Sequence, residues 1–268
     1  MRSPSSLDHV LSDPANAGVW RAGTLDGAST RTVPTGYAAL DGVLSGKGWP
    51  LGAMVEVLQV QAGHHEWGFV SPAVSAMQRE DAAALTVLVG APHLPFGPAL
   101  GARQVNMQRL LSVHSAQGQA PSLLWATREA LQCADVAVVL AWLPDARSAH
   151  LRRLQIAAHA HGKLLFVFRP LRAQNESSPA PLRLLVEGCN SESASLSVTV
   201  LKRRGPPLAA PLLLDTRPRR LAELLLASRE RVRRKRDETA PLLPSFVANP
   251  SSVSVHALLD RIAHLDHH

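Results

Sequence analysis

The stretch MVEVLQVQAGHHEWG, residues 54–68, decides the fold of this 268-residue chain. Its first half, MVEVLQV, is an apolar run with the length and composition of a strand. The polar loop QAGHHEWG follows, and a helix is predicted from about residue 66 to residue 79. Strand, short loop and helix form the first unit of an alternating α/β chain.

The alternation of strand and helix continues along the chain. Apolar runs predict strands at residues 84–90, 109–114, 135–144 and 163–170, and helices are predicted near 99–105, 122–132 and 146–161. This order predicts an α/β fold with a doubly wound, mostly parallel sheet. Ligands bind such sheets at the carboxyl ends of the strands, so the candidate site lies in the loops 59–68, 90–98 and 140–147.

Local signals define the ends of several elements. Thr35 is predicted to cap the first helix of the core, and Ser122 is predicted to cap the helix over residues 122–132. Gly162 is expected to end the helix before it. Residues 181–187 and 195–204 are two strand-like runs around a polar turn, which predicts a C-terminal antiparallel hairpin at the sheet edge.

We expect four parts in the chain. Residues 1–32 predict a flexible N-terminal arm, residues 33–216 the core, and residues 217–238 a basic helix. Residues 239–268 predict a proline-rich linker and a short amphipathic C-terminal helix, which together with the basic helix form a helical tail. The apolar face of the last helix is a candidate partner-binding surface made by Val255, Leu258, Leu259, Ile262 and Leu265.

Positive charge is concentrated in the basic helix. The chain has 28 Lys and Arg against 21 Asp and Glu, a net charge of +7. The last turns of the basic helix carry Arg229, Arg231, Arg233, Arg234, Lys235 and Arg236. Such a cluster complements the helix dipole and favours nucleic acid or an acidic partner, with an affinity that falls as salt rises. The alternative is a solvated charged helix.

Several classes of chemistry lack their motifs. Cys133 and Cys189 are the only cysteines and form no CxxC pair, so neither a zinc site nor a disulfide framework is expected. The 12 histidines include no HExxH motif, so no metal is expected, and no GxSxG elbow offers a serine nucleophile. The chain has no secretory signal and no apolar run near the roughly 20 residues that span a bilayer. We therefore expect a cytoplasmic protein without membrane contact.

The run VPTGYAALDGVLSGKGWPLGAMVEVLQ, residues 33–59, resembles the opening of the RecA recombinase core. The match rests on Thr35-Gly36, Ala39-Leu40-Asp41 and the turn Gly48-Trp49-Pro50-Leu51-Gly52, at agreeing spacing. Later segments agree in order, so the resemblance covers about residues 33–215. It implies a RecA-like core.

Within the RecA superfamily the chain is most similar to the ImuA family. The similarity is carried by Trp49-Pro50 and by the segments APHLPFGPAL, VLAWLP, LRRLQ, FRP and LKRRG. It implies a role in SOS-induced, mutagenic translesion DNA synthesis, in the cytoplasm and at the nucleoid after DNA damage. The implied partners are an ImuB-like polymerase-related protein, an error-prone C-family DNA polymerase, RecA and DNA. The alternatives are a SulA-like cell-division inhibitor and a weakly active DNA-dependent ATPase.

The resemblance also locates an ATP site that has lost its residues. A working P-loop needs glycines, a lysine on the phosphates and a Ser/Thr on Mg²⁺. The corresponding loop contains Gln59, Gly63, His64, His65 and Glu66, and only the glycine is retained. The lysine position falls on His65 or Glu66, depending on a one-residue shift in alignment. We therefore expect no bound cofactor, although weak nucleotide binding without hydrolysis stays open.

Two further positions of the RecA pattern have lost their acids. The aspartate that orients the Mg²⁺ water corresponds to Leu140, and the glutamate that activates water corresponds to Pro92. Three lost requirements together predict a protein that is not an enzyme. Basic residues do remain at the strand end Lys202, Arg203 and Arg204, where RecA proteins reach a neighbour's nucleotide. That strand end is a candidate partner or DNA contact, and the alternative is a solvated strand end.

Overall fold

The computed structural model describes residues 31–115, 119–190 and 193–238. The elements in chain order are β1 (Thr32–Val33), α2 (Ala38–Val43), β2 (Trp49–Pro50), β3 (Ala53–Gln59), α3 (Glu66–Glu80), β4 (Leu85–Val89), α4 (Gly97–Ala102), η3 (Met107–Arg109), β5 (Leu110–Val113), α5 (Ala120–Gln132), β6 (Val136–Trp142), α6 (Ser148–His161), β7 (Leu164–Pro170), η4 (Leu171–Asn175), β8 (Leu182–Asn190), β9 (Ser193–Lys202), β10 (Leu212–Asp215) and α7 (Arg219–Glu238). The strands predicted between residues 54 and 170 are confirmed to within two residues.

The core is an eight-stranded sheet in the order β10-β9-β8-β3-β7-β6-β4-β5. The six strands from β8 to β5 pair in parallel, as predicted. The predicted antiparallel hairpin is β8 and β9. It does not reach the edge, because β10 adds an antiparallel strand beyond β9 that the sequence pattern did not predict.

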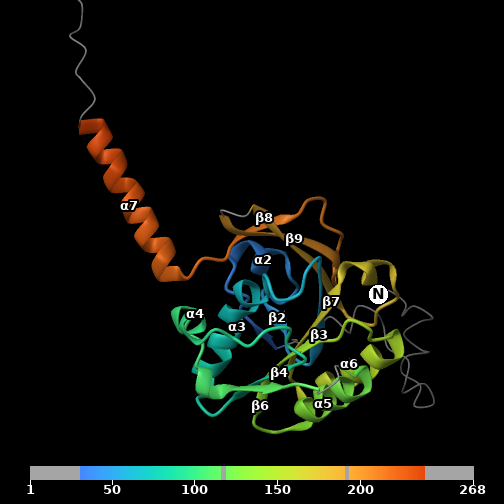
Figure 1. Cartoon of the computed structure of the whole chain (residues 1–268). Helices are drawn as coiled ribbons and strands as arrows, with labels where there is room; N and C mark the ends of the chain where they lie inside the picture. Colours follow the sequence, from blue (N-terminus) through green and yellow to red (C-terminus); the bar gives the residue numbers. More distant parts are fainter. Residues whose placement is uncertain (1–30, 116–118, 191–192, 239–268) are drawn as a thin grey trace, which may run out of the picture. The chain divides into compact units, whose positions relative to one another are not determined.

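Helices cover both faces of the sheet, which confirms the doubly wound arrangement. α2 and α3 pack on one face, where Val55 and Val57 of β3 point into the larger apolar cluster. α5 and α6 lie side by side on the other face, over a second cluster that contains Met54 (Figure 1). Every residue of β3 is buried, as expected of a parallel strand covered on both sides. The loop after β3 is therefore carried by the most enclosed part of the sheet.

Two predicted helix caps are wrong, and one helix end is right. The Thr35 hydroxyl accepts a hydrogen bond from the Tyr37 amide at 3.0 Å in a turn before α2, and Tyr37 takes the cap position. Helix α5 begins two residues earlier than Ser122 because Pro121 suits a first turn. Gly162 ends α6 in the left-handed conformation, as predicted.

The C-terminal helix α7 lies close to the predicted range 217–238. Two compact units divide between Ala222 and Glu223, inside α7. The predicted arm over 1–32, except its last two residues, and the predicted linker and partner helix over 239–268 lie outside the described residues. Among the helices that are described, none is both long and apolar enough to cross a membrane.

Candidate functional site

The expected nucleotide loop lies at the carboxyl end of β3, between Gln59 and the first residue of α3, Glu66. A strand, a short loop and a helix N-terminus form the arrangement that binds phosphate in P-loop proteins. The three residues Gly63, His64 and His65 precede the helix directly. All five predicted positions therefore lie in the loop between β3 and α3 or at its two ends.

Glu66 fills this loop with its own carboxylate. The Glu66 side chain turns back toward the loop, and the residue is 3% exposed. Its Oε1 accepts hydrogen bonds from the Gly63 amide at 2.6 Å and the Gln59 Nε2 at 2.7 Å. Its Oε2 accepts one from the His65 amide at 3.0 Å. Backbone N–H groups that a P-loop would offer to phosphate thus bind an internal anion.

A fourth donor comes from across the sheet. Trp142, the last residue of β6, donates its indole N–H to Glu66 Oε1 at 2.9 Å. The Trp142 ring also stacks on Phe168 of β7, with ring centroids 4.7 Å apart. Sequence patterns did not single out Trp142 for this role. The only feature of the sequence that points to this role is a tryptophan, which carries an N–H donor, at the carboxyl end of the apolar strand β6.

The hydrogen bonds determine the charge of the site. Burial raises the pKa of the Glu66 carboxyl, but the bonds from Gly63, Trp142 and Gln59 outweigh burial and hold that pKa below its usual value. Burial and the neighbouring His64 lower the pKa of His65. At neutral pH the loop therefore carries an ionised carboxylate and a neutral imidazole. A phosphate about 4 Å from that carboxylate would be repelled by about 4 kcal/mol at an effective dielectric of 20.

The loop after β4 closes the nucleotide loop from one side. Gly63 has φ +90°, and a Cβ built on it would lie 2.7 Å from His93 Nε2 and 3.3 Å from Pro92 Cγ. A side chain at position 63 would therefore collide with His93. Pro92, which is predicted to stand at the water-activating position, lies beside the loop and offers no acid.

The expected metal position is part of the apolar core. Leu140 is fully buried and pairs with Leu88 of β4 and Phe166 of β7. It lies on the same face of β6 as Trp142, two residues further along the strand. No carboxylate can reach a metal from this position. In the described ranges as a whole, no three His, Cys, Asp or Glu side chains group to hold a metal ion.

A hollow of about 390 Å³ opens between the loop and the end of β8. His64 and His65 line it on one side, and Glu187 and Gly188 on the other. A Cβ on Gly188 would lie 2.9 Å from His65 Nε2, so the imidazole packs against bare backbone. The Glu187 carboxylate makes this hollow unsuited to a phosphate group as well.

The basic strand end lies near the amino end of β8, whereas Glu66 lies beyond the carboxyl end of the parallel strand β3. Lys202 ends β9 and pairs with Arg183 near the start of β8, whereas the nucleotide loop follows the carboxyl end of β3. The Lys202 ammonium donates to the Ser178 carbonyl at 3.1 Å, and Arg203 donates to the carbonyls of Pro206 and Val43. These two cations bind the chain itself. Arg204 is exposed.

The predicted basic cluster lies on α7. Four of its side chains are exposed, those of Arg229, Arg231, Arg233 and Arg234. Lys235 and Arg236 belong to the same helix, but their side chains lie outside the described residues. The helix also exposes the apolar side chains of Leu224, Leu226 and Val232. α7 thus exposes both charged and apolar side chains.

Sequence patterns missed a buried ion cluster on the face opposite Trp142. The fully buried Glu56 of β3 accepts from Arg169 of β7 at 3.0 Å and from Arg183 of β8 at 2.7 Å. Arg169 also binds Glu176 and the Ala146 carbonyl, both at 2.7 Å. The cluster joins three adjacent strands and pairs its carboxylate with two cations, which is a structural arrangement. Its signal was a charged residue within each of three apolar strands, Glu56, Arg169 and Arg183.

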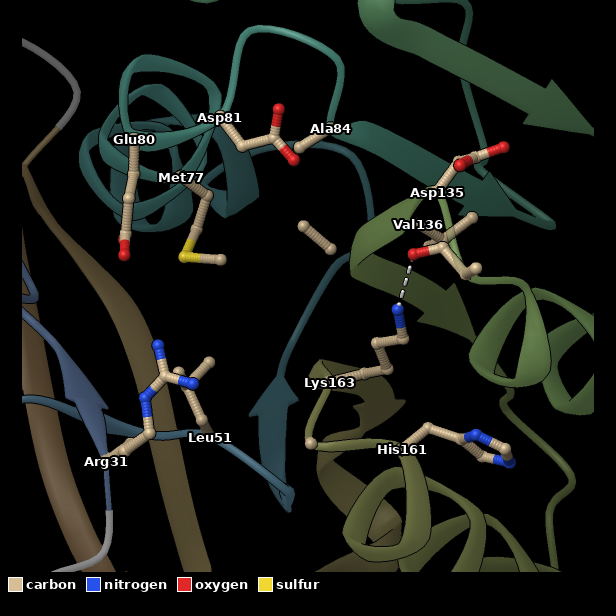
Figure 2. Close-up of a pocket in the computed structure, with 13 residues that line it drawn as sticks. Arg31, Leu51, Met77, Glu80, Asp81, Ala84, Asp135, Val136, His161 and Lys163 are labelled. Carbon is tan, nitrogen blue, oxygen red and sulfur yellow. Dashed lines mark hydrogen bonds between the residues drawn. The ribbon is translucent and has the colours of Figure 1, made fainter.

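A second hollow, of about 230 Å³, lies at the amino ends of the strands (Figure 2). Lys163 donates to the Ala134 carbonyl at 2.9 Å there (Figure 2), and Arg31, Asp81 and Asp135 are among the residues that line the hollow. Charges of both signs line this hollow. Doubly wound sheets bind ligands at the other end of their strands, so we assign it no function.

The fold and the site define an α/β protein with a parallel central sheet, in which the loop before α3 binds a carboxylate of the same chain. No protein-family model and no curated protein matches the sequence.

Proposed function

We propose that this chain is a RecA-like adaptor without ATPase activity that serves SOS-induced, mutagenic translesion DNA synthesis. One observation carries the loss of activity: the Glu66 carboxylate accepts hydrogen bonds from the loop amides of Gly63 and His65. ATP would have to displace a buried, ionised and fully hydrogen-bonded side chain before its phosphates could bind. The adaptor role rests on the similarity to the ImuA family described above.

The architecture is compatible with a RecA-like core. A parallel sheet is covered by helices on both faces, and the loop-bearing strand β3 lies inside it between β8 and β7. The positions that align with the RecA acids fall at Pro92, beside the loop, and at Leu140, on the strand that ends in Trp142. Neither residue can bind a metal or activate water.

The adaptor then acts through surfaces that bind partners and not through the nucleotide loop. α7 presents arginines in its second half, and such a surface suits DNA phosphates or an acidic partner. The expected partners are an ImuB-like polymerase-related protein and an error-prone C-family polymerase, together with RecA. The predicted amphipathic face from Val255 to Leu265 is a second candidate contact, of the kind that docks into a partner's groove.

Affinity capture tests the proposal. Full-length tagged chain, isolated from its own cells after DNA damage, should retain a polymerase-related protein that mass spectrometry identifies. Reversing Arg233 and Arg234 to glutamate should weaken the capture. A matched control reverses the adjacent pair Arg152 and Arg153, which are exposed on α6. The control should leave the capture unchanged.

Two outcomes would replace the proposal. Capture of the division tubulin homologue, with arrested polymerisation in the purified system, would assign the SulA-like role. ATP hydrolysis that disappears when His65 and Glu66 are replaced would assign an active ATPase.

A further inference from the structure

A third hollow, of about 410 Å³, forms where four segments distant in sequence meet. It is lined by the turn before α2, the middle of α3, the end of α4 and the junction between β10 and α7. The turn before α2 is held firmly, because Gly36 has φ +86° and packs directly on Pro72 of α3. Gln104, at the end of α4, is also in the left-handed conformation, with φ 63°. The walls are thus set by backbone turns that few sequences adopt.

Guanidinium groups dominate the lining of this hollow. Arg79, Arg103, Arg217 and Arg220 all face it, and Asp215 is the acidic residue among the lining side chains. The Asp215 carboxylate accepts hydrogen bonds from Nε and Nη2 of Arg217, which form one edge of the guanidinium. Among the described side chains, Arg79, Arg103 and Arg220 form no ion pair with a carboxylate. With four arginines and one aspartate, the lining carries three more positive than negative charges.

Arg103 occupies the most enclosed position of the three. Its Nη1 donates to the Thr216 carbonyl at 2.7 Å, which anchors the guanidinium against the start of the α7 segment. Burial lowers the pKa of Arg103, because no carboxylate offsets the lost water. Tyr37 also lines the hollow, and burial raises its pKa to about 12. The Tyr37 hydroxyl therefore stays protonated and donates to the Gly68 carbonyl.

Two further features of the hollow favour an anion. The helix α7 starts here, and its first backbone bond runs from the Ala222 amide to the Pro218 carbonyl, so the preceding amides have no intrahelical acceptor. Helix N-termini attract phosphate and other anions. In addition, Ser75 on the lining face of α3 has a buried hydroxyl without a hydrogen-bond partner in the described structure. Arg79 lies one turn further along α3 and donates to the Ser75 carbonyl at 3.3 Å.

We propose that this hollow, the Arg103 pocket, binds the phosphate group of a phosphate ester. Arg103 and Arg220 supply fork-shaped donors that match phosphate oxygens, and the α7 amides add to the positive field. The pocket lies on the core unit, within residues 1–222, and is separate from the loop that Glu66 fills. It would bind phosphate whether or not the chain acts in translesion synthesis. Two sources share this chemistry, a free nucleotide and the backbone or end of a DNA strand.

Calorimetric titration of the full chain at low salt tests the pocket with three probes. These are inorganic phosphate, adenosine monophosphate, and a short oligothymidine with and without a 5′-phosphate. We expect saturable binding of at least one probe, weakened about tenfold or more by Arg220→Glu, since a charge-assisted bond is replaced by a repulsion. Arg152→Glu makes the same charge change on the exposed face of α6 and should leave the affinity within about twofold.

Arg103→Lys provides a second variant that keeps the charge but loses the fork. It should weaken phosphate binding while thermal unfolding shows that the chain stays folded. Tight binding of the monophosphate assigns the pocket to a nucleotide, and binding of the oligonucleotide alone assigns it to DNA. The proposal is overturned if no probe binds the wild-type chain, or if Arg152→Glu weakens binding as much as Arg220→Glu.

Discussion

Replacing Glu66 with alanine should destabilise the chain by about 3 to 4 kcal/mol at pH 7. The substitution removes the acceptor for the amides of Gly63 and His65, for Gln59 and for the Trp142 indole. Each buried donor without a partner costs about 1–3 kcal/mol. Water can enter a polar space of this size and recover part of the loss, which brings the net effect below the sum of the four.

Glu66→Gln separates charge from shape. A glutamine carbonyl at the Oε1 position keeps the three donors that bind there. Its amide then faces the His65 N–H, so one bond becomes a donor–donor contact. We expect a smaller loss, about 1–2 kcal/mol, because most of the acceptor geometry survives.

Denaturation in urea measures both effects as shifts of the midpoint at constant slope. The matched control is Glu80→Ala, at the exposed end of the same helix, which should change stability by less than about 0.5 kcal/mol. If Glu66→Ala shifts the urea midpoint as little as Glu80→Ala does, the Glu66 carboxylate does not hold the loop.

Three further predictions concern the same loop and the ion cluster behind it. Trp142→Phe keeps the stacking on Phe168 but removes one donor to an ionised group, so urea denaturation should show a loss of about 1.5–3 kcal/mol. Glu56→Gln removes the negative charge that pairs with Arg169 and Arg183 and should lower the free energy of unfolding by about 3–5 kcal/mol in the same assay. An unchanged midpoint would show that the cluster is solvated. The pKa of Glu66 is lower in the folded chain than its value of about 4.3 in the unfolded chain. The ionised carboxylate therefore contributes its full stabilisation above about pH 4.3, and this stabilisation is lost as the pH falls through the folded-state pKa. The stability gap between wild type and Glu66→Gln should therefore close in acid, and a gap that widens there would contradict the assignment.

Apolar runs were sufficient to predict the parallel strands, because strands buried on both faces leave few polar residues in their sequences. The helix caps were less predictable. Ser122 is a good cap by propensity, yet Pro121 favours the first turn of α5 and shifts its start upstream. The short strand β10 was missed because its four residues, LLLD, show no alternation and lie close to prolines. Its pairing with β9 depends on tertiary structure rather than on local pattern.

The candidate site was predicted in position but not in conformation. The sequence predicts that Gly63, His65 and Glu66 share one loop and that this loop does not bind a nucleotide in the usual way. It could not show that the Glu66 carboxylate turns back onto the amides before it. That conformation depends on the φ of Gly63, on His93 from the next loop, and on Trp142, which is 76 residues away in sequence from Glu66.

The Glu66 carboxylate occupies the loop amides that a P-loop would offer to phosphate. Calorimetric titration of the wild-type chain with Mg·ATP, alongside a hydrolysis assay with single-stranded DNA, tests it most directly. A signal from the Arg103 pocket is recognised by repeating the titration on Arg220→Glu, which should weaken binding there about tenfold or more. We predict that any ATP binding by the wild-type chain is weakened by Arg220→Glu to that extent, and that neither protein hydrolyses ATP. Saturable ATP binding to the variant that is lost when His65 and Glu66 are replaced would contradict it.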